Sequence, residues 1–257
     1  MILMTGKEVA ENLKITEENK KLILLLIGDN PSAITYANSI KKKAANFQNI
    51  CVEIVQFSEE TFTQEVIDYI ESISNEVDAI LPILPFPHHI SEVCITEAIP
   101  SKMDIDCLGS QKLGLFYLGF GKGGATPTSV IELLSHYKIP LSGKHAVVLG
   151  RSRAIGRQVA EYLLSHNATV TVCHSKTENL EEILKTGDIV VSAMGKPHFV
   201  KPDMVKDGVV IVDVGTTWED GKLKGDVDPE VMNKASAFTP VPGGVGVVSG
   251  KMLLSML

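Results

Sequence analysis

The first feature of this sequence that is suited to catalysis is a tyrosine followed by a run of lysines. The stretch TYANSIKKKAA, residues 35–45, places Tyr36 just upstream of Lys41, Lys42 and Lys43. A lysine amine can take up and release protons near neutral pH when its surroundings lower its pKa. Three adjacent charges on a helix are more often a solvated surface. This stretch alone leaves both interpretations open.

A glycine-containing turn later in the chain could bind a dinucleotide. In VVLGRSRAIGRQVAEYLL, Gly150 ends an expected strand and Gly156 opens an expected helix. Such a turn presents the free N–H groups of a helix N-terminus to phosphate oxygens, and Gly156 allows close packing of helix on strand. The pattern is Gly-x-Ser-x-x-x-Gly instead of Gly-x-Gly-x-x-Gly, so a tight turn without a ligand is the alternative.

The end of the next strand bears on which dinucleotide would bind. An NAD site usually has a carboxylate there for the ribose hydroxyl, but the stretch CHSKT, residues 173–177, has none. Ser175 and Lys176, together with Arg151 and Arg153 of the turn, are suited to a 2′-phosphate. We therefore predict NADP over NAD, with a solvated basic turn as the alternative.

The composition and net charge limit the classes of protein to which this chain can belong. The chain has 257 residues, of which 44% are hydrophobic and 21% charged, with a net charge of −7. These values are typical of a globular protein and disfavour nucleic-acid binding. No apolar run is long enough for a membrane span, and the first residues lack the pattern of a secretion signal, so we expect a cytoplasmic protein. Four dispersed cysteines predict reduced thiols, and no metal-binding motif is present.

Two series of β-strands and α-helices must position these residues. Apolar runs at 21–28, 51–57 and 78–84 predict buried parallel strands, with helices at 38–47 and 64–74 between them.

A glycine-rich stretch at 114–129 then predicts a domain boundary, followed by a helix at 128–137 that begins on a Ser or Thr cap. The chain ends in an apolar stretch at 247–257 that predicts a helix. Four more strands are expected at 143–150, 168–174, 188–195 and 208–215. The predicted fold class is α/β, with two α/β domains, the second Rossmann-like.

Several segments in this order resemble the bifunctional methylenetetrahydrofolate dehydrogenase/methenyltetrahydrofolate cyclohydrolase family, over nearly the whole chain. The matching segments are GDNPSAITYANSIKKKA, PILPFPHHI, SKMDIDCLG, ATPTSV, VVLGRSRAIGRQVA, IVVSAMGKPHFV, VIVDVGTTWEDGKLKGDVD and FTPVPGGVG.

The resemblance implies two domains that flank a cleft. A folate-binding catalytic domain would span residues 1–118, with a helix at 247–257 packing back on it, and an NADP-binding domain would span residues 119–246. The chain would oxidise 5,10-methylenetetrahydrofolate with NADP and hydrolyse the methenyl product to 10-formyltetrahydrofolate. The resemblance also implies a homodimer.

The resemblance further implies roles for individual residues. Tyr36 would stack on the folate, a nearby lysine would transfer protons during hydrolysis, and Asp106 would bind the pterin. Ile83 and the glycine-rich loop of Pro242, Gly243 and Gly244 would line the folate site. The residues implied to contact NADP are Gly150, Arg151, Ser152, Ser175 and Thr216.

Three departures from the family pattern qualify these roles. Ile83 replaces a glutamine that would bind the lysine, and VVS replaces PMT at residues 247–249. The family spaces its tyrosine and lysine four residues apart, but Ile40 stands at that position. A π-bulge could absorb one inserted residue and present Lys41, which we predict to be catalytic; Lys43 is the alternative on a regular helix.

These departures leave two other functions open. One is a dehydrogenase with weak or absent cyclohydrolase activity, which Ile83 and the shifted lysine would explain. The other is a non-catalytic nucleotide-binding protein that has kept the fold.

Overall fold

The protein, described by a computed structural model at residues 1–219 and 221–257, divides into two compact units. The three-stranded unit consists of Lys14–Gly123 and Leu253–Leu257, and the six-stranded unit consists of Met1–Leu13 and Gly124–Met252. The sequence prediction differs at two places. It set the boundary five residues earlier, at 118/119, and it grouped the first 13 residues with the first domain.

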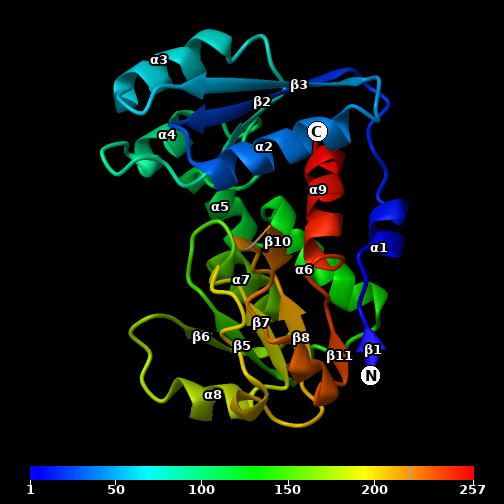
Figure 1. The fold of residues 1–257 in the computed structure, drawn as a ribbon. Coiled ribbons are helices and arrows are strands. Elements are labelled where there is room, and N and C mark those ends of the chain that lie inside the picture. Colours follow the sequence, from blue (N-terminus) through cyan, green and yellow to red (C-terminus); the bar gives the residue numbers. More distant parts are fainter. Residues whose placement is uncertain (220) are drawn as a thin grey trace. The chain divides into compact units, whose positions relative to one another are not determined.

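The three-stranded unit is built on a parallel sheet of order β3-β2-β4, of which Figure 1 labels β2 and β3. The central strand β2 is buried from Leu22 to Ile27, as expected for a strand covered on both faces. The predicted strands are confirmed as β2 (Lys20–Ile27), β3 (Ile50–Phe57) and β4 (Ala79–Pro82). The helices of this unit are α2 (Pro31–Ala44), α3 (Thr63–Ile73), α4 (Glu92–Ala98) and α5 (Ser110–Tyr117).

The six-stranded unit contains a parallel sheet of order β1-β11-β8-β7-β5-β6. After the short edge strand β1, the chain re-enters the sheet at β5, adds β6 on one side and then continues on the other side from β7. The direction of winding therefore reverses between β5 and β7, which is where dinucleotides bind in folds of this kind. The strands are β1 (Ile2–Leu3), β5 (His145–Leu149), β6 (Thr169–Cys173), β7 (Ile189–Ser192), β8 (Val210–Asp213) and β11 (Ala237–Phe238).

Helices cover both faces of the six-stranded sheet, and alternate strand residues point to each face. Ala146 and Val148 of β5 pack in a cluster with side chains of α6 (Ala125–His136) and α7 (Gly156–Ser165). Val147 and Leu149 pack in a second cluster on the opposite face. That cluster includes residues of α8 (Leu180–Thr186) and the 3₁₀ helices η1 (Pro202–Met204) and η2 (Pro229–Asn233).

The remaining elements are short or lie at the chain ends. The strands β9 (Thr217–Glu219) and β10 (Lys222–Lys224) pair antiparallel, a hairpin that the sequence did not predict. The helix α1 is Lys7–Asn12, and the C-terminal helix α9 is Val245–Ser255, close to its predicted range. Among the described residues, no helix combines the length and apolar character needed to cross a membrane.

Two helices begin earlier than predicted. The helix α2 starts at Pro31, seven residues before the predicted start, because Asn30 caps it and proline is well suited to the first helical position. The helix α6 starts at Ala125 after Gly124, so the predicted Ser or Thr cap is wrong. Pro127 lies in its first turn, where no helical N–H bond is lost.

Candidate active site and cofactor-binding edge

The helix α2 carries Tyr36 and the lysine run in a regular α-helical conformation. The Asn30 side chain accepts hydrogen bonds from the N–H groups of Ser32 and Ala33 at 3.0 and 3.1 Å, which fixes the helix start. The conformation is α-helical throughout Pro31–Ala44, without a π-helical turn. The bulge on which the prediction of Lys41 depended is therefore absent from this helix.

A regular helix gives the three lysines different environments. Ile40, one turn after Tyr36, is 1% exposed and belongs to the buried face of α2. Lys41 and Lys42 are exposed, whereas Lys43 is half-buried. Burial lowers the pKa of the Lys43 ammonium, because a charged group is less stable away from water. Seven residues correspond to almost two full helical turns, so Lys43 lies on nearly the same face as Tyr36.

Tyr36 and Asp106 interact electrostatically within the three-stranded unit. The pKa of the Tyr36 hydroxyl is raised, first by desolvation and second by the negative charge of Asp106. Tyr36 as a whole residue is 43% exposed, although its hydroxyl is desolvated. Tyr36 therefore remains a protonated hydrogen-bond donor at neutral pH.

Ile83 follows β4 directly and is buried, with 1% of its surface exposed. Its N–H donates to the carbonyl of Leu25 at 2.9 Å, which extends the pairing of β4 with β2 by one residue. Like Ile40, it is an aliphatic residue at a place where the family pattern has a polar one. Both positions are therefore buried and apolar in this chain.

The turn after β5 has the geometry expected of a phosphate-binding loop. Gly150 has φ +110°, and a Cβ atom there would collide with the carbonyl of Ala193. A Cβ atom at Gly156 would collide with the carbonyl of Gly150, so the start of α7 packs directly on the turn. The Ser152 hydroxyl accepts from the N–H groups of Ile155 and Gly156 at 3.2 and 3.4 Å. Ser152 thus ties the turn to the start of α7, a structural role the sequence did not indicate.

The residues predicted to bind a 2′-phosphate are at the same edge of the sheet. Gly150 follows β5, and Ser175 follows the neighbouring strand β6, which pairs with β5 in parallel. The side chains of Ser175, Lys176 and Arg151 are exposed, and Arg153 is half-buried. Backbone without a side chain beside hydroxyl and cationic groups fits a phosphorylated dinucleotide.

Two more predicted contacts lie in the six-stranded unit. Thr216 follows β8 and is exposed at the carboxyl end of that strand. The loop of Pro242, Gly243 and Gly244 precedes α9, and Gly243 has φ +116°, a conformation that favours glycine. The Gly243 carbonyl accepts from the N–H of Gly6 at 2.7 Å, which ties this loop to the start of the chain.

Sequence reasoning missed a pair of buried carboxylates, Asp213 and Asp226, which are 2% and 0% exposed. Asp213 accepts hydrogen bonds from the N–H groups of Gly215, Asp226 and Val227. Asp226 accepts from the Ser192 hydroxyl and from the N–H groups of Met194 and Lys196. Both aspartates lie in the glycine-flanked stretches DVG and GDVD, a signal for close packing that could have been recognised.

Comparison with known proteins matches two family profiles to this chain. The catalytic domain of tetrahydrofolate dehydrogenase/cyclohydrolase matches residues 4–106, and the NAD(P)-binding domain of the same enzymes matches residues 124–257. The chain belongs to the tetrahydrofolate dehydrogenase/cyclohydrolase family. The resemblance inferred from the sequence motifs is thereby confirmed.

Similar proteins cover the chain almost completely. The bifunctional protein FolD of Campylobacter hominis is 43% identical and covers 99% of this chain and 95% of its own. FolD of Clostridium perfringens strain SM101 is 40% identical, and the match covers 96% of this chain and 91% of that protein. Among solved structures, FolD from Campylobacter jejuni has 37% identity and a TM-score of 0.91, and the match covers 100% of this chain and 96% of that one. FolD from Trypanosoma brucei, complexed with NADP and an inhibitor, has 30% identity and a TM-score of 0.89. That match covers 99% of this chain and 95% of the other.

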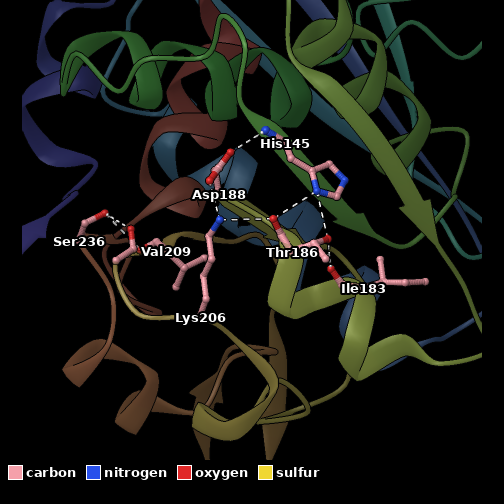
Figure 2. A network of polar contacts seen from close by, with 8 residues as sticks. His145, Ile183, Thr186, Asp188, Lys206, Val209 and Ser236 are labelled. Carbon is pink, nitrogen blue, oxygen red and sulfur yellow. Dashed lines mark hydrogen bonds and ion pairs between the residues drawn. The ribbon is translucent and has the colours of Figure 1, made fainter.

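The opposite edge of the six-stranded sheet of this family member carries a polar network without a predicted site residue (Figure 2). Asp188 precedes β7 and accepts from the backbone N–H of His145 at 2.8 Å and from the Lys206 ammonium at 2.6 Å. These bonds lower the pKa of Asp188, the bond from Lys206 most. The network joins the amino ends of β5 and β7, and we assign it to stability of the sheet.

Proposed function

We propose that this protein oxidises 5,10-methylenetetrahydrofolate to 5,10-methenyltetrahydrofolate with NADP and then hydrolyses the product to 10-formyltetrahydrofolate. One observation carries the proposal: both halves of the dehydrogenase/cyclohydrolase family are present in a single chain, with identity near 40% to bifunctional relatives over nearly the full length. Both steps belong to one-carbon metabolism.

NADP would bind at the carboxyl edge of the six-stranded sheet. Gly150 provides a turn without a side chain, and Arg151 and Ser175 provide a cation and a hydroxyl for phosphate oxygens. Ser152 maintains the turn by accepting from N–H groups at the start of α7, and Thr216 would contact the nicotinamide from the end of β8. NADP supplies the hydride acceptor, so the protein's part in this step is to orient the two rings.

The residues proposed to contact the folate have side chains or backbone suited to that ligand. The Asp106 carboxylate is suited to the two donors on the aminopyrimidinone edge of a pterin. Tyr36 is partly exposed, and its ring would stack on the aminobenzoyl group. Ile83 would contribute apolar surface, and the glycine-rich loop of Pro242, Gly243 and Gly244 would allow backbone to approach a flat ligand.

For the hydrolysis we propose Lys43 in place of Lys41 as the proton-transfer group. The premise for Lys41 was a π-bulge, and α2 has none. Lys41 is exposed, whereas Lys43 is half-buried, lies on the face of Tyr36 and has a lowered pKa. A lysine with a lowered pKa releases its proton nearer to neutral pH and can serve as a general base toward water.

The family resemblance further supports a homodimer in the cytoplasm. Size-exclusion chromatography with light scattering tests the first statement, and fractionation of the source cells tests the second. A monomer at micromolar concentration would contradict the homodimer.

A two-signal absorbance assay tests the proposed function. Purified protein is mixed with 5,10-methylenetetrahydrofolate and NADP, and NADPH and the methenyl compound are followed together. We expect NADPH to form while the methenyl signal stays low, and NAD to support a slower reaction. If NADPH forms while the methenyl compound accumulates and decays no faster than it does without protein, the chain is a dehydrogenase alone.

A further inference from the structure

Asp213 and Asp226 are buried together at the carboxyl edge of the six-stranded sheet, outside the residues that would touch a ligand. Each carboxylate accepts three hydrogen bonds, at 2.9 to 3.1 Å for Asp213 and 2.7 to 2.9 Å for Asp226. No lysine, arginine or histidine of the described residues forms an ion pair with either carboxylate. Buried acids without a cation are costly, so this arrangement requires an explanation beyond packing.

The glycines around the pair show how closely it is packed. A Cβ atom at Gly215 would overlap the Asp226 carboxyl group, and one at Gly225 would overlap the Asp213 carboxyl group. Each acid therefore sits against a backbone segment that has no side chain. The carboxylates occupy the space that two side chains would otherwise fill.

The bonds of Asp226 hold the loop that backs the phosphate turn. Asp226 binds the N–H groups of Met194 and Lys196, which leave the end of β7. Ala193 begins this loop, and its carbonyl is the group that a Cβ atom at Gly150 would strike. The position of this loop thus sets the position of Gly150.

The bonds of Asp213 extend the connection to the other end of the proposed cofactor site. Asp213 binds the N–H of Gly215, the residue before Thr216, and also the N–H of Asp226 itself. Close contacts and backbone neighbours therefore connect Gly150 with Thr216, by way of Ala193–Met194, Asp226, Asp213 and Gly215.

We propose that Asp226, anchored by Asp213, is a positioning residue for NADP that fixes the distance between the phosphate turn and the nicotinamide contact. This inference rests on the proposed function, since it takes NADP as the ligand. Neither carboxylate touches the cofactor, and both act through backbone N–H groups. Removing one acceptor oxygen should loosen the binding site without affecting the folate chemistry of the three-stranded unit.

Asp226→Asn is the direct test. An amide keeps one acceptor oxygen and turns an NH₂ group toward one of the bound N–H groups, so one bond is replaced by a donor–donor contact. We expect the NADP dissociation constant from calorimetry to rise about tenfold or more, with the KM for NADP rising in parallel. Hydrolysis of added methenyltetrahydrofolate without NADP should stay within about twofold of wild type.

Two matched controls separate positioning from stability. Asp228→Asn makes the same change two residues away, where the carboxylate pairs with Lys201 at 2.9 Å, and should leave NADP binding unchanged. Asp188→Asn weakens the opposite edge of the same sheet (Figure 2) and should lower the melting temperature without weakening NADP binding. Equal loss of NADP affinity in Asp188→Asn and Asp226→Asn would overturn the proposal.

A milder variant covers the case in which Asp226→Asn does not fold. Ser192→Ala removes one of the three donors to Asp226, and we expect a smaller rise of the NADP dissociation constant in a folded protein. Unchanged NADP affinity in Ser192→Ala together with an unfolded Asp226→Asn would assign the pair to folding alone. Wild-type protein that fails to bind NADP would contradict the proposed function, whereas NADP binding that is unaffected in Asp226→Asn would contradict only this inference.

Discussion

The three lysines of α2 do not follow the tyrosine–lysine spacing of the family. The family spacing places a lysine one turn after tyrosine, but in this chain that position is Ile40, which is buried. The helix remains regular, so the inserted residue rotates the lysines around the axis instead of forming a bulge. Lys43 then returns to the face of Tyr36, two turns along the helix.

Ile83 is a buried aliphatic residue at a position where the family pattern has glutamine. Replacing it with glutamine restores a polar group where the family has one, and a polar neighbour stabilises a charged lysine. We expect Ile83→Gln to raise the pKa of Lys43 and to shift the pH profile of methenyl hydrolysis to higher pH. Stability should fall by about 1–3 kcal/mol, because Ile83 is buried.

Ile83→Val is the control, since it keeps an aliphatic side chain at the site. Its hydrolysis profile should match that of the wild type. Identical rates and profiles for Ile83→Gln and Ile83→Val would show that residue 83 does not influence the proton-transfer group.

At the scale of elements, the start of α2 depends on one side chain. Asn30 caps the helix by accepting from two N–H groups, and Tyr36 follows within the second turn. Asn30→Ala should lower the free energy of unfolding by about 1 kcal/mol. Asn38→Ala, in the exposed middle of the same helix, should be neutral or slightly stabilising, because alanine favours the helix interior. Urea denaturation of both variants measures the difference, and an equal loss would contradict the capping role.

Most strands and both parallel sheets could be predicted from the sequence, because a strand buried on both faces reads as a short apolar run. The β5 residues His145–Leu149 and the β8 residues Val210–Asp213 follow that rule. The first two turns of α2 were missed because their residues, PSAITYA, have no strong helical periodicity. The pairing of Asp213 with Asp226 was missed because it forms only when β7, β8 and the segment after β10 come together.

At the scale of the whole molecule, the buried acids should make stability depend on pH. Burial, and secondarily the charge of Asp226, raises the pKa of Asp213 from 3.8 to about 7. Because the folded-state pKa lies above the unfolded value, the stabilising contribution of the protonated acid is complete below about pH 4. It is lost as the pH rises to about 7, and the loss amounts to about 2–4 kcal/mol.

Asparagine cannot titrate, so Asp213→Asn lacks the pH-dependent contribution of Asp213 to stability. We expect the free energy of unfolding of the wild type, minus that of Asp213→Asn, to fall between about pH 4 and pH 7 and to level off above it. Urea denaturation at a series of pH values measures it. A difference that stays constant, or that rises with pH, would show that Asp213 is ionised throughout this range.

The proposed site residues are divided between the two units. The residues proposed for NADP lie in the six-stranded unit, and Tyr36, Lys43 and Asp106 lie in the three-stranded unit. The acid–base group that we propose for the hydrolysis is therefore in a different unit from the proposed NADP contacts. A change at the lysine should therefore separate the two activities.

Parallel assays of wild type, Lys43→Met and Lys41→Met test this account most directly. In each protein, NADPH formation from 5,10-methylenetetrahydrofolate is measured together with hydrolysis of added methenyltetrahydrofolate. We expect Lys43→Met to lose about 100-fold or more in hydrolysis, as removal of a general acid–base group does, while NADPH formation continues and Lys41→Met retains both activities. Loss of hydrolysis in Lys41→Met with normal hydrolysis in Lys43→Met would contradict the account.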